Sequence, residues 1–167
     1  MMEGRQMSND ISTTTGNSLS FVAPESVTFV DIRRNPKRYP RIRAVKRDIA
    51  IRYMAAIVQQ ACLYKNTPAD LESIRFTATA LLDELLDAKS IGADLLSFAE
   101  IQRVVKRAVL NKDLYISVAS LFAELRSYCL TEGHAANVTA MQKGPLEPGY
   151  YIGRLQDKMA QELINKK

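Results

Sequence analysis

Apolar residues recur at the 3.6-residue spacing of an amphipathic helix in four stretches of this chain. The first stretch begins just after Pro40 and runs to about Tyr64, and the others follow Thr67, Ser97 and Ser117. The stripe of the first contains Ile42, Val45, Ile49, Tyr53, Ala56 and Leu63. Four such helices with short connections predict an all-α fold, a compact four-helix bundle-like domain over residues 41–142.

Local signals predict where these helices begin and end. Thr67 and Pro68 are typical of an N-cap and a first helical position, and Ser97 to Glu100 form a capping-box sequence. Leu71, Ile74, Ala78, Leu81 and Leu85 predict the buried seam of the second helix. Gly133 either ends the fourth helix or marks a weak point within it, and we favour the weak point, with continuation to Gln142.

The two ends of the chain have a different composition. Residues 1–20 are polar and aperiodic, which predicts a disordered tail, and residues 21–32 are short and β-branched, which predicts an extended arm or one edge strand. Residues 143–149 contain two prolines and two glycines and predict a linker. Residues 150–167 predict a short amphipathic helix that either folds back on the bundle or binds another protein. Its candidate contact residues are Tyr151, Ile152, Leu155, Met159 and Leu163.

No apolar run approaches the roughly 18 residues of a transmembrane helix, and the N-terminus lacks the pattern of a secretory signal. We therefore expect a cytoplasmic protein that does not contact a membrane. Cys62 and Cys129 lie among apolar neighbours far apart in the sequence, so we expect buried free thiols.

Positive charge is concentrated in one segment of the chain. Residues 31–52 contain nine basic and two acidic side chains, a net charge of +7, whereas the whole chain carries +5. The remainder is therefore slightly acidic, and a local charge of this kind indicates an anionic partner.

Two prolines, Pro36 and Pro40, keep the residues before them out of helical geometry, which predicts an extended basic arm over residues 21–40. Such an arm can follow a phosphate backbone while Tyr39 stacks on an exposed base. The candidate nucleic-acid contacts are Arg33, Arg34, Lys37, Arg38, Tyr39, Arg41, Arg43, Lys46 and Arg47. The alternatives are an acidic protein partner and a solvated surface with no specific partner. Nothing here specifies bases, so binding would be independent of sequence.

No catalytic, metal or cofactor motif accompanies the basic segment. His134 is the one histidine and has no assignable nucleophile, and Asp83, Glu84 and Asp87 are typical of a solvated helix face. Arg103, Lys106 and Arg107 form a second basic strip, which matters only if it lies beside the arm. We expect no enzyme activity, no metal and no cofactor.

Several stretches also carry a family resemblance: Pro40-Arg41-Ile42-Arg43-Ala44-Val45-Lys46-Arg47, Leu95-Leu96-Ser97-Phe98-Ala99-Glu100-Ile101 followed by Lys106-Arg107-Ala108, Asp113-Leu114-Tyr115-Ile116, and Leu125-Arg126-Ser127-Tyr128. Their order from Pro40 to about Ala136 resembles small helical proteins of Bacteroidetes phages and mobile elements, some regarded as replication-accessory or helicase-loader-like proteins. The chain departs from that family at residues 111–115, where a glycine-rich aromatic turn is expected. The resemblance implies a replication-accessory role and brings no catalytic residues.

The leading hypothesis is therefore a non-enzymatic helical protein that binds nucleic acid through the basic arm and a protein, such as a replicative helicase, through another face. The alternative is a structural or assembly protein, such as a phage virion component, that acts through protein–protein contacts.

Overall fold

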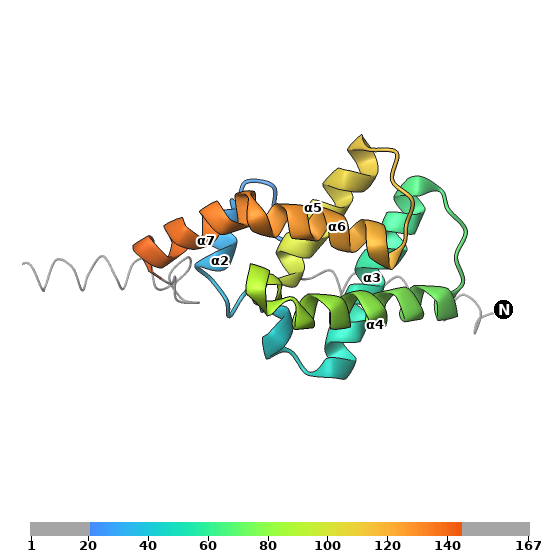
Figure 1. Ribbon diagram of the computed structural model, residues 1–167, viewed down its shortest axis with the longest axis horizontal. Helices are drawn as coiled ribbons and strands as arrows, with labels where there is room; N and C mark the ends of the chain where they lie inside the picture. The colour runs from blue at the N-terminus through green and yellow to red at the C-terminus, as the bar shows by residue number, and fades with distance from the viewer. Residues whose placement is uncertain (1–20, 145–167) are drawn as a thin grey trace, which may run out of the picture.

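Helices and the turns between them make up residues 21–144, the part of the chain that the computed structural model describes, and no strand occurs within that range (Figure 1). The all-α prediction is confirmed. The helices are α2 (Phe29–Arg33), α3 (Arg47–Lys65), α4 (Leu71–Asp87), α5 (Phe98–Asn111), α6 (Val118–Leu130) and α7 (Glu132–Lys143). Three short 3-10 turns, η2 (Ile42–Ala44), η3 (Lys89–Ile91) and η4 (Ala93–Leu95), connect them.

The core lies where α3, α4, α5 and α6 meet. Its largest fully buried side chains include Met54, Ile57, Leu81, Leu82, Leu85, Phe98, Ile101, Leu121 and Leu125. The rings of Phe98 and Tyr53 are 5.2 Å apart, and Gln102 donates to Gln60 at 2.8 Å. Tyr53 thus contacts Phe98, and Gln60, further along α3, contacts Gln102, further along α5. Because the contacts advance in the same direction along both helices, α3 and α5 run parallel.

Residues 21–33, which precede α3 in the chain, also pack against this core. The Phe21 ring lies 5.0 Å from the Tyr53 ring and 5.6 Å from the Phe98 ring, and Phe21 is buried. Thr28 then caps α2 by accepting a hydrogen bond from the Asp31 amide at 3.1 Å. This segment packs against the core, and its second half is the helix α2 rather than the predicted extended arm or edge strand.

The first two long helices begin later than the sequence predicts. Residues 42–44 form a 3-10 turn, and extended backbone at Val45 and Lys46 separates that turn from α3. Asp70, not Thr67, caps α4, because the Thr67 amide closes the end of α3 by donating to the Cys62 carbonyl at 2.8 Å. Leu63 and Leu71, both predicted to face the core, are exposed as a result of their places at these helix ends.

The later helix boundaries agree with their predictions. Ser97 and Glu100 form the capping box of α5, and Ser117 caps α6. α6 ends at Leu130, and α7 continues the chain after Thr131. The predicted weak point therefore exists, but it lies at Thr131, two residues before Gly133, which is itself part of α7. The linker beyond Gly144, the C-terminal segment 150–167 with its five candidate contacts, and the polar tail 1–20 lie outside the described residues.

Both cysteines are free and buried, as predicted. Over residues 21–144 the helices include none that is long and apolar enough to cross a membrane.

Candidate nucleic-acid interface

The basic segment is folded onto the bundle, so the prediction of an extended arm is wrong. Arg33 is buried at the end of α2, and Tyr39 is buried in a small second core with Ile32 and Ala99. The chain turns between them, where the Tyr39 amide donates to the Asn35 carbonyl at 2.9 Å. Proline disfavours helical geometry for the residue before it but permits turns, so Pro36 and Pro40 do not force the segment to be extended. Burying the apolar surface of the Tyr39 ring is also favourable in free energy, which favours the folded-back arrangement. Tyr39 is therefore not available to stack on a base.

Arg33 is occupied by an internal ion pair. Its Nε donates to Glu100 Oε2 at 2.7 Å, and its Nη1 donates to Asn137 Oδ1 at 3.2 Å. Glu100 also accepts from the Tyr128 hydroxyl at 2.6 Å and from the amide and hydroxyl of Ser97. Burial lowers the pKa of Arg33, but the charge and hydrogen bond of Glu100 outweigh that effect, so its pKa is raised overall. Arg33 holds α2 against α5 and α7 and does not face a phosphate.

Three further members of the segment have partners within the protein. Arg34 Nε donates to the Gly144 carbonyl at 2.8 Å, which leaves its charge uncompensated. Arg47 forms two hydrogen bonds with Asp83, at 2.7 and 3.2 Å, and Arg43 lies 3.4 Å from Asp94. Both of these arginines are about half exposed, so the pairs are screened and open to exchange with another anion.

Five predicted contacts have no carboxylate within salt-bridge distance in residues 21–144: Arg34, whose acceptor is a carbonyl, and Lys37, Arg38, Arg41 and Lys46. Lys37, Arg38 and Lys46 are exposed, and the Arg38 guanidinium lies 5.5 Å from the centre of the Tyr39 ring. The segment therefore keeps most of its excess charge after folding.

Arg41 differs from its neighbours because its environment opposes its charge. Its backbone is fixed by a bridge to Ser97, and the next amide, of Ile42, donates to the Leu96 carbonyl at 2.8 Å. Burial, and then the charges of Arg33 and Arg43, lower the pKa of Arg41. No side chain of the described range forms a hydrogen bond or ion pair with it. A half-buried cation in this position is stabilised by an incoming anion.

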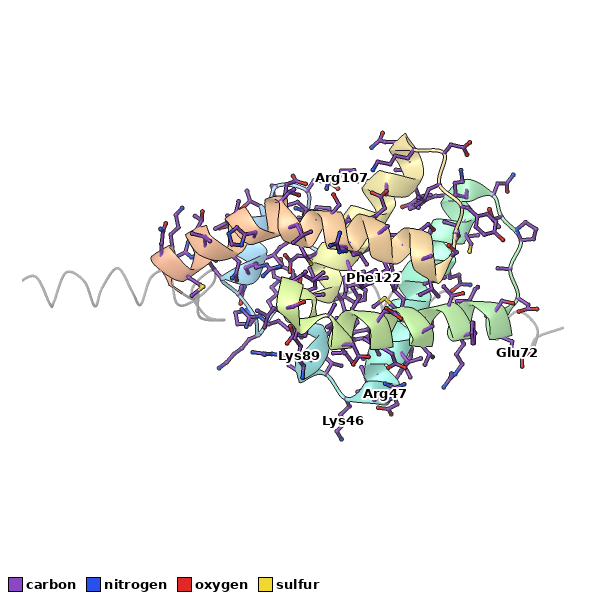
Figure 2. All side chains as sticks on the ribbon, in the orientation of Figure 1. Lys46, Arg47, Glu72, Lys89, Arg107 and Phe122 are labelled. Carbon is purple, nitrogen blue, oxygen red and sulfur yellow. The ribbon has the colours of Figure 1, made fainter. Side chains whose placement is uncertain are left out.

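Lys89 joins this region from η3, and sequence analysis did not place it there. It lines an open hollow of about 510 Å³ together with Arg43, Arg47 and Asp94. Figure 2 shows Lys46, Arg47 and Lys89 along one edge of the molecule. No local pattern could have identified Lys89, because it reaches this edge only through the packing of α4 against α3. We define the basic surface as Lys37, Arg38, Arg41, Arg43, Lys46, Arg47 and Lys89.

The second basic strip does not extend the basic surface. Arg103 donates to the carbonyls of Val27 and Pro24, at 2.6 and 2.8 Å, and so fastens the N-terminal segment to α5. Arg107 pairs with Glu132 at 2.7 Å, and Lys106 lies 5.9 Å from the centre of the Tyr64 ring.

A second hollow, of about 520 Å³, is lined by Arg33, Lys89, Cys129, His134 and Asn137 among others. Burial raises the pKa of the Cys129 thiol to about 11, so this sulfur is not a nucleophile at neutral pH. His134 is exposed. Within residues 21–144 no group of three or more metal-ligating side chains comes together.

Comparisons with protein-family models, with curated proteins and with solved structures found no match to this chain. The resemblance to small phage and mobile-element proteins therefore stays a prediction.

Proposed function

We propose that this protein is a non-enzymatic nucleic-acid-binding factor that holds a phosphate backbone on its basic surface without reading base sequence. The observation that carries the proposal is Arg41, a half-buried guanidinium that has no hydrogen-bond or ion-pair partner in residues 21–144. The exposed cations Lys37, Arg38 and Lys46 lie within five residues of it in the sequence. The described part of this surface offers no exposed aromatic ring beside these cations, because Tyr39 is buried. Phosphate contacts therefore account for the expected affinity.

The experiment is a fluorescence-anisotropy titration of single- and double-stranded DNA across a salt series. The logarithm of the affinity falls linearly with the logarithm of the salt concentration, by about 0.9 for each phosphate contact on duplex DNA. The double variant Arg38→Ala/Arg41→Ala should lower that slope by about 2.

The matched control is Arg75→Ala/Arg126→Ala, which removes two exposed arginines of α4 and α6 and changes the net charge equally. The control should retain the wild-type slope. Equal losses in both variants would show that only the net charge matters and would overturn the assignment of the surface.

In biological terms, we propose a replication-accessory role for a phage or mobile element, with a replicative helicase as the protein partner. This role rests on the sequence resemblance together with the basic surface. It is tested by co-purification from the native host with and without nuclease, in which a helicase retained after nuclease treatment supports the proposal. The alternative function, a structural or assembly protein, is favoured by exposed apolar side chains at one end of the bundle, which are taken up next.

A further inference from the structure

Apolar side chains are exposed where α3 ends and α4 begins, and again where α5 gives way to α6. Tyr115 is 80% exposed and Leu63 is 73% exposed. We name this set the apolar end, and it consists of Leu63, Tyr64, Leu71, Phe76, Leu110 and Tyr115.

The two connections that carry these residues lie at the same end of the molecule. Lys65 Nζ, at the end of α3, is 3.3 Å from Asp113 Oδ1 in the α5–α6 connection. Figure 1 shows the α3–α4 and α5–α6 connections together, and the label of Glu72 marks the same end in Figure 2. Exposed apolar residues gathered in this way indicate an interaction surface.

The chain itself contains a segment whose chemistry suits this surface. Of the two segments outside the described range, residues 1–20 lack an apolar period, whereas residues 150–163 carry one at helical spacing. An amphipathic helix that places its apolar stripe on a partner is a common mode of protein recognition.

Chain length argues against the segment reaching the apolar end of its own molecule. α6 and α7 lead away from that end and bring the chain to Gly144 at the opposite side (Figure 1). At 1.5 Å per residue these two helices cover on the order of 35 Å. The connection from Gly144 to Tyr150 spans about 20 Å when fully extended. Because the connection is shorter than the distance that α6 and α7 cover, most of the apolar stripe of residues 150–163 cannot reach the apolar end of its own molecule.

We propose that the apolar end binds the segment 150–163 of a second copy of this chain, so that copies associate head to tail. The two surfaces of such a contact differ, and repetition gives rings or open chains rather than a closed two-fold dimer. This inference goes beyond nucleic-acid binding, because the association needs no nucleic acid.

The test is sedimentation velocity and light scattering of the full chain over a wide concentration range, without nucleic acid. Wild type should associate. Leu63→Ser/Tyr115→Ser in the apolar end and Leu155→Ser/Met159→Ser in the segment should each abolish association. The control is Leu130→Ser/Met141→Ser, which replaces two exposed apolar residues of α6 and α7 and should leave association intact. Circular dichroism checks that each variant is folded.

Mixing the two variants gives the decisive result. Each has one intact surface, so the mixture should form one-to-one dimers and nothing larger. Three results would overturn the proposal: a wild type that stays monomeric at every concentration, a mixture that stays monomeric, or a control that loses association as well. A monomeric wild type that still binds DNA would leave the proposed function standing, so the two failures are distinguishable.

Discussion

Two arginine–carboxylate pairs of the same length provide a direct test of how burial determines stability. Arg33 and Glu100 are 2.7 Å apart with side chains 4% and 1% exposed, whereas Arg47 and Asp83 are 2.7 Å apart with side chains 55% and 49% exposed. We predict that Glu100→Gln lowers the free energy of unfolding by about 3–5 kcal/mol, because it leaves a buried guanidinium without a counter-charge. Asp83→Asn should produce little change, because water and salt already screen the exposed pair.

The assay is urea denaturation followed by far-UV circular dichroism, at low and high salt. A loss of about 3–5 kcal/mol is a large share of the 5–15 kcal/mol typical of a single domain, so Glu100→Gln should shift the midpoint strongly. Adding Arg33→Met to Glu100→Gln should recover part of the loss, because both charges of the buried pair are then gone. The reasoning is refuted if Glu100→Gln is no more destabilising than Asp83→Asn, or if the double variant is less stable than Glu100→Gln alone.

Three further predictions concern single positions. Arg41→Met keeps the apolar stem and removes repulsion, so unfolding by urea should show stability equal to wild type or higher, while the salt slope for DNA binding falls by about 1; a clear loss of stability would contradict this. Gly133→Ala should lower the free energy of unfolding by about 1–3 kcal/mol in the same assay, because its Cβ would lie 2.8 Å from the Tyr128 ring; an unchanged midpoint would be the contrary result. The hydrogen bond from the Ser73 amide lowers the pKa of Asp70 below 3.8. The stability advantage of wild type over Asp70→Asn should therefore be complete above pH 3.8 and shrink as the pH falls through the lowered pKa. Denaturation over a pH series checks this, and an advantage that grows in acid would refute it.

Local sequence signals predicted the parts of the fold that depend on local interactions. The capping box of Ser97 and Glu100 involves residues within a few positions of one another, so the sequence pattern contained the information. The break between α6 and α7 was predicted at Gly133 and lies two residues earlier, at Thr131. The start of α4 was predicted wrongly because residues 66 and 67 cap the C-terminus of α3, where Asn66 has a left-handed backbone. Whether these residues end α3 or begin α4 depends on both helices, so the sequence pattern of one helix does not reveal it.

The candidate site was predicted by charge but not by geometry. Counting charges identified the segment but could not distinguish Arg33, which pairs with a carboxylate 67 residues away, from Arg41, which pairs with none in the described range. Lys89 was missed for the same reason, because its place beside Arg43 follows from helix packing. A periodic pattern reports which face of a helix is buried, and it does not report which polar groups meet across the core.

The order in which the chain is made gives the docking of residues 21–33 a consequence for folding. Phe21 packs on Phe98, and Arg33 donates to Asn137, 104 residues further along the chain. During synthesis this segment leaves the ribosome first, yet its binding site is complete only after α7 has been made. We therefore expect α3, α4 and α5 to collapse together early and the N-terminal segment to dock in a late, slower step, as is usual for contacts that close long loops. A nascent chain stopped before α7 should leave α2 accessible to proteases, because α2 packs mainly on α7, and release of the complete chain should protect it.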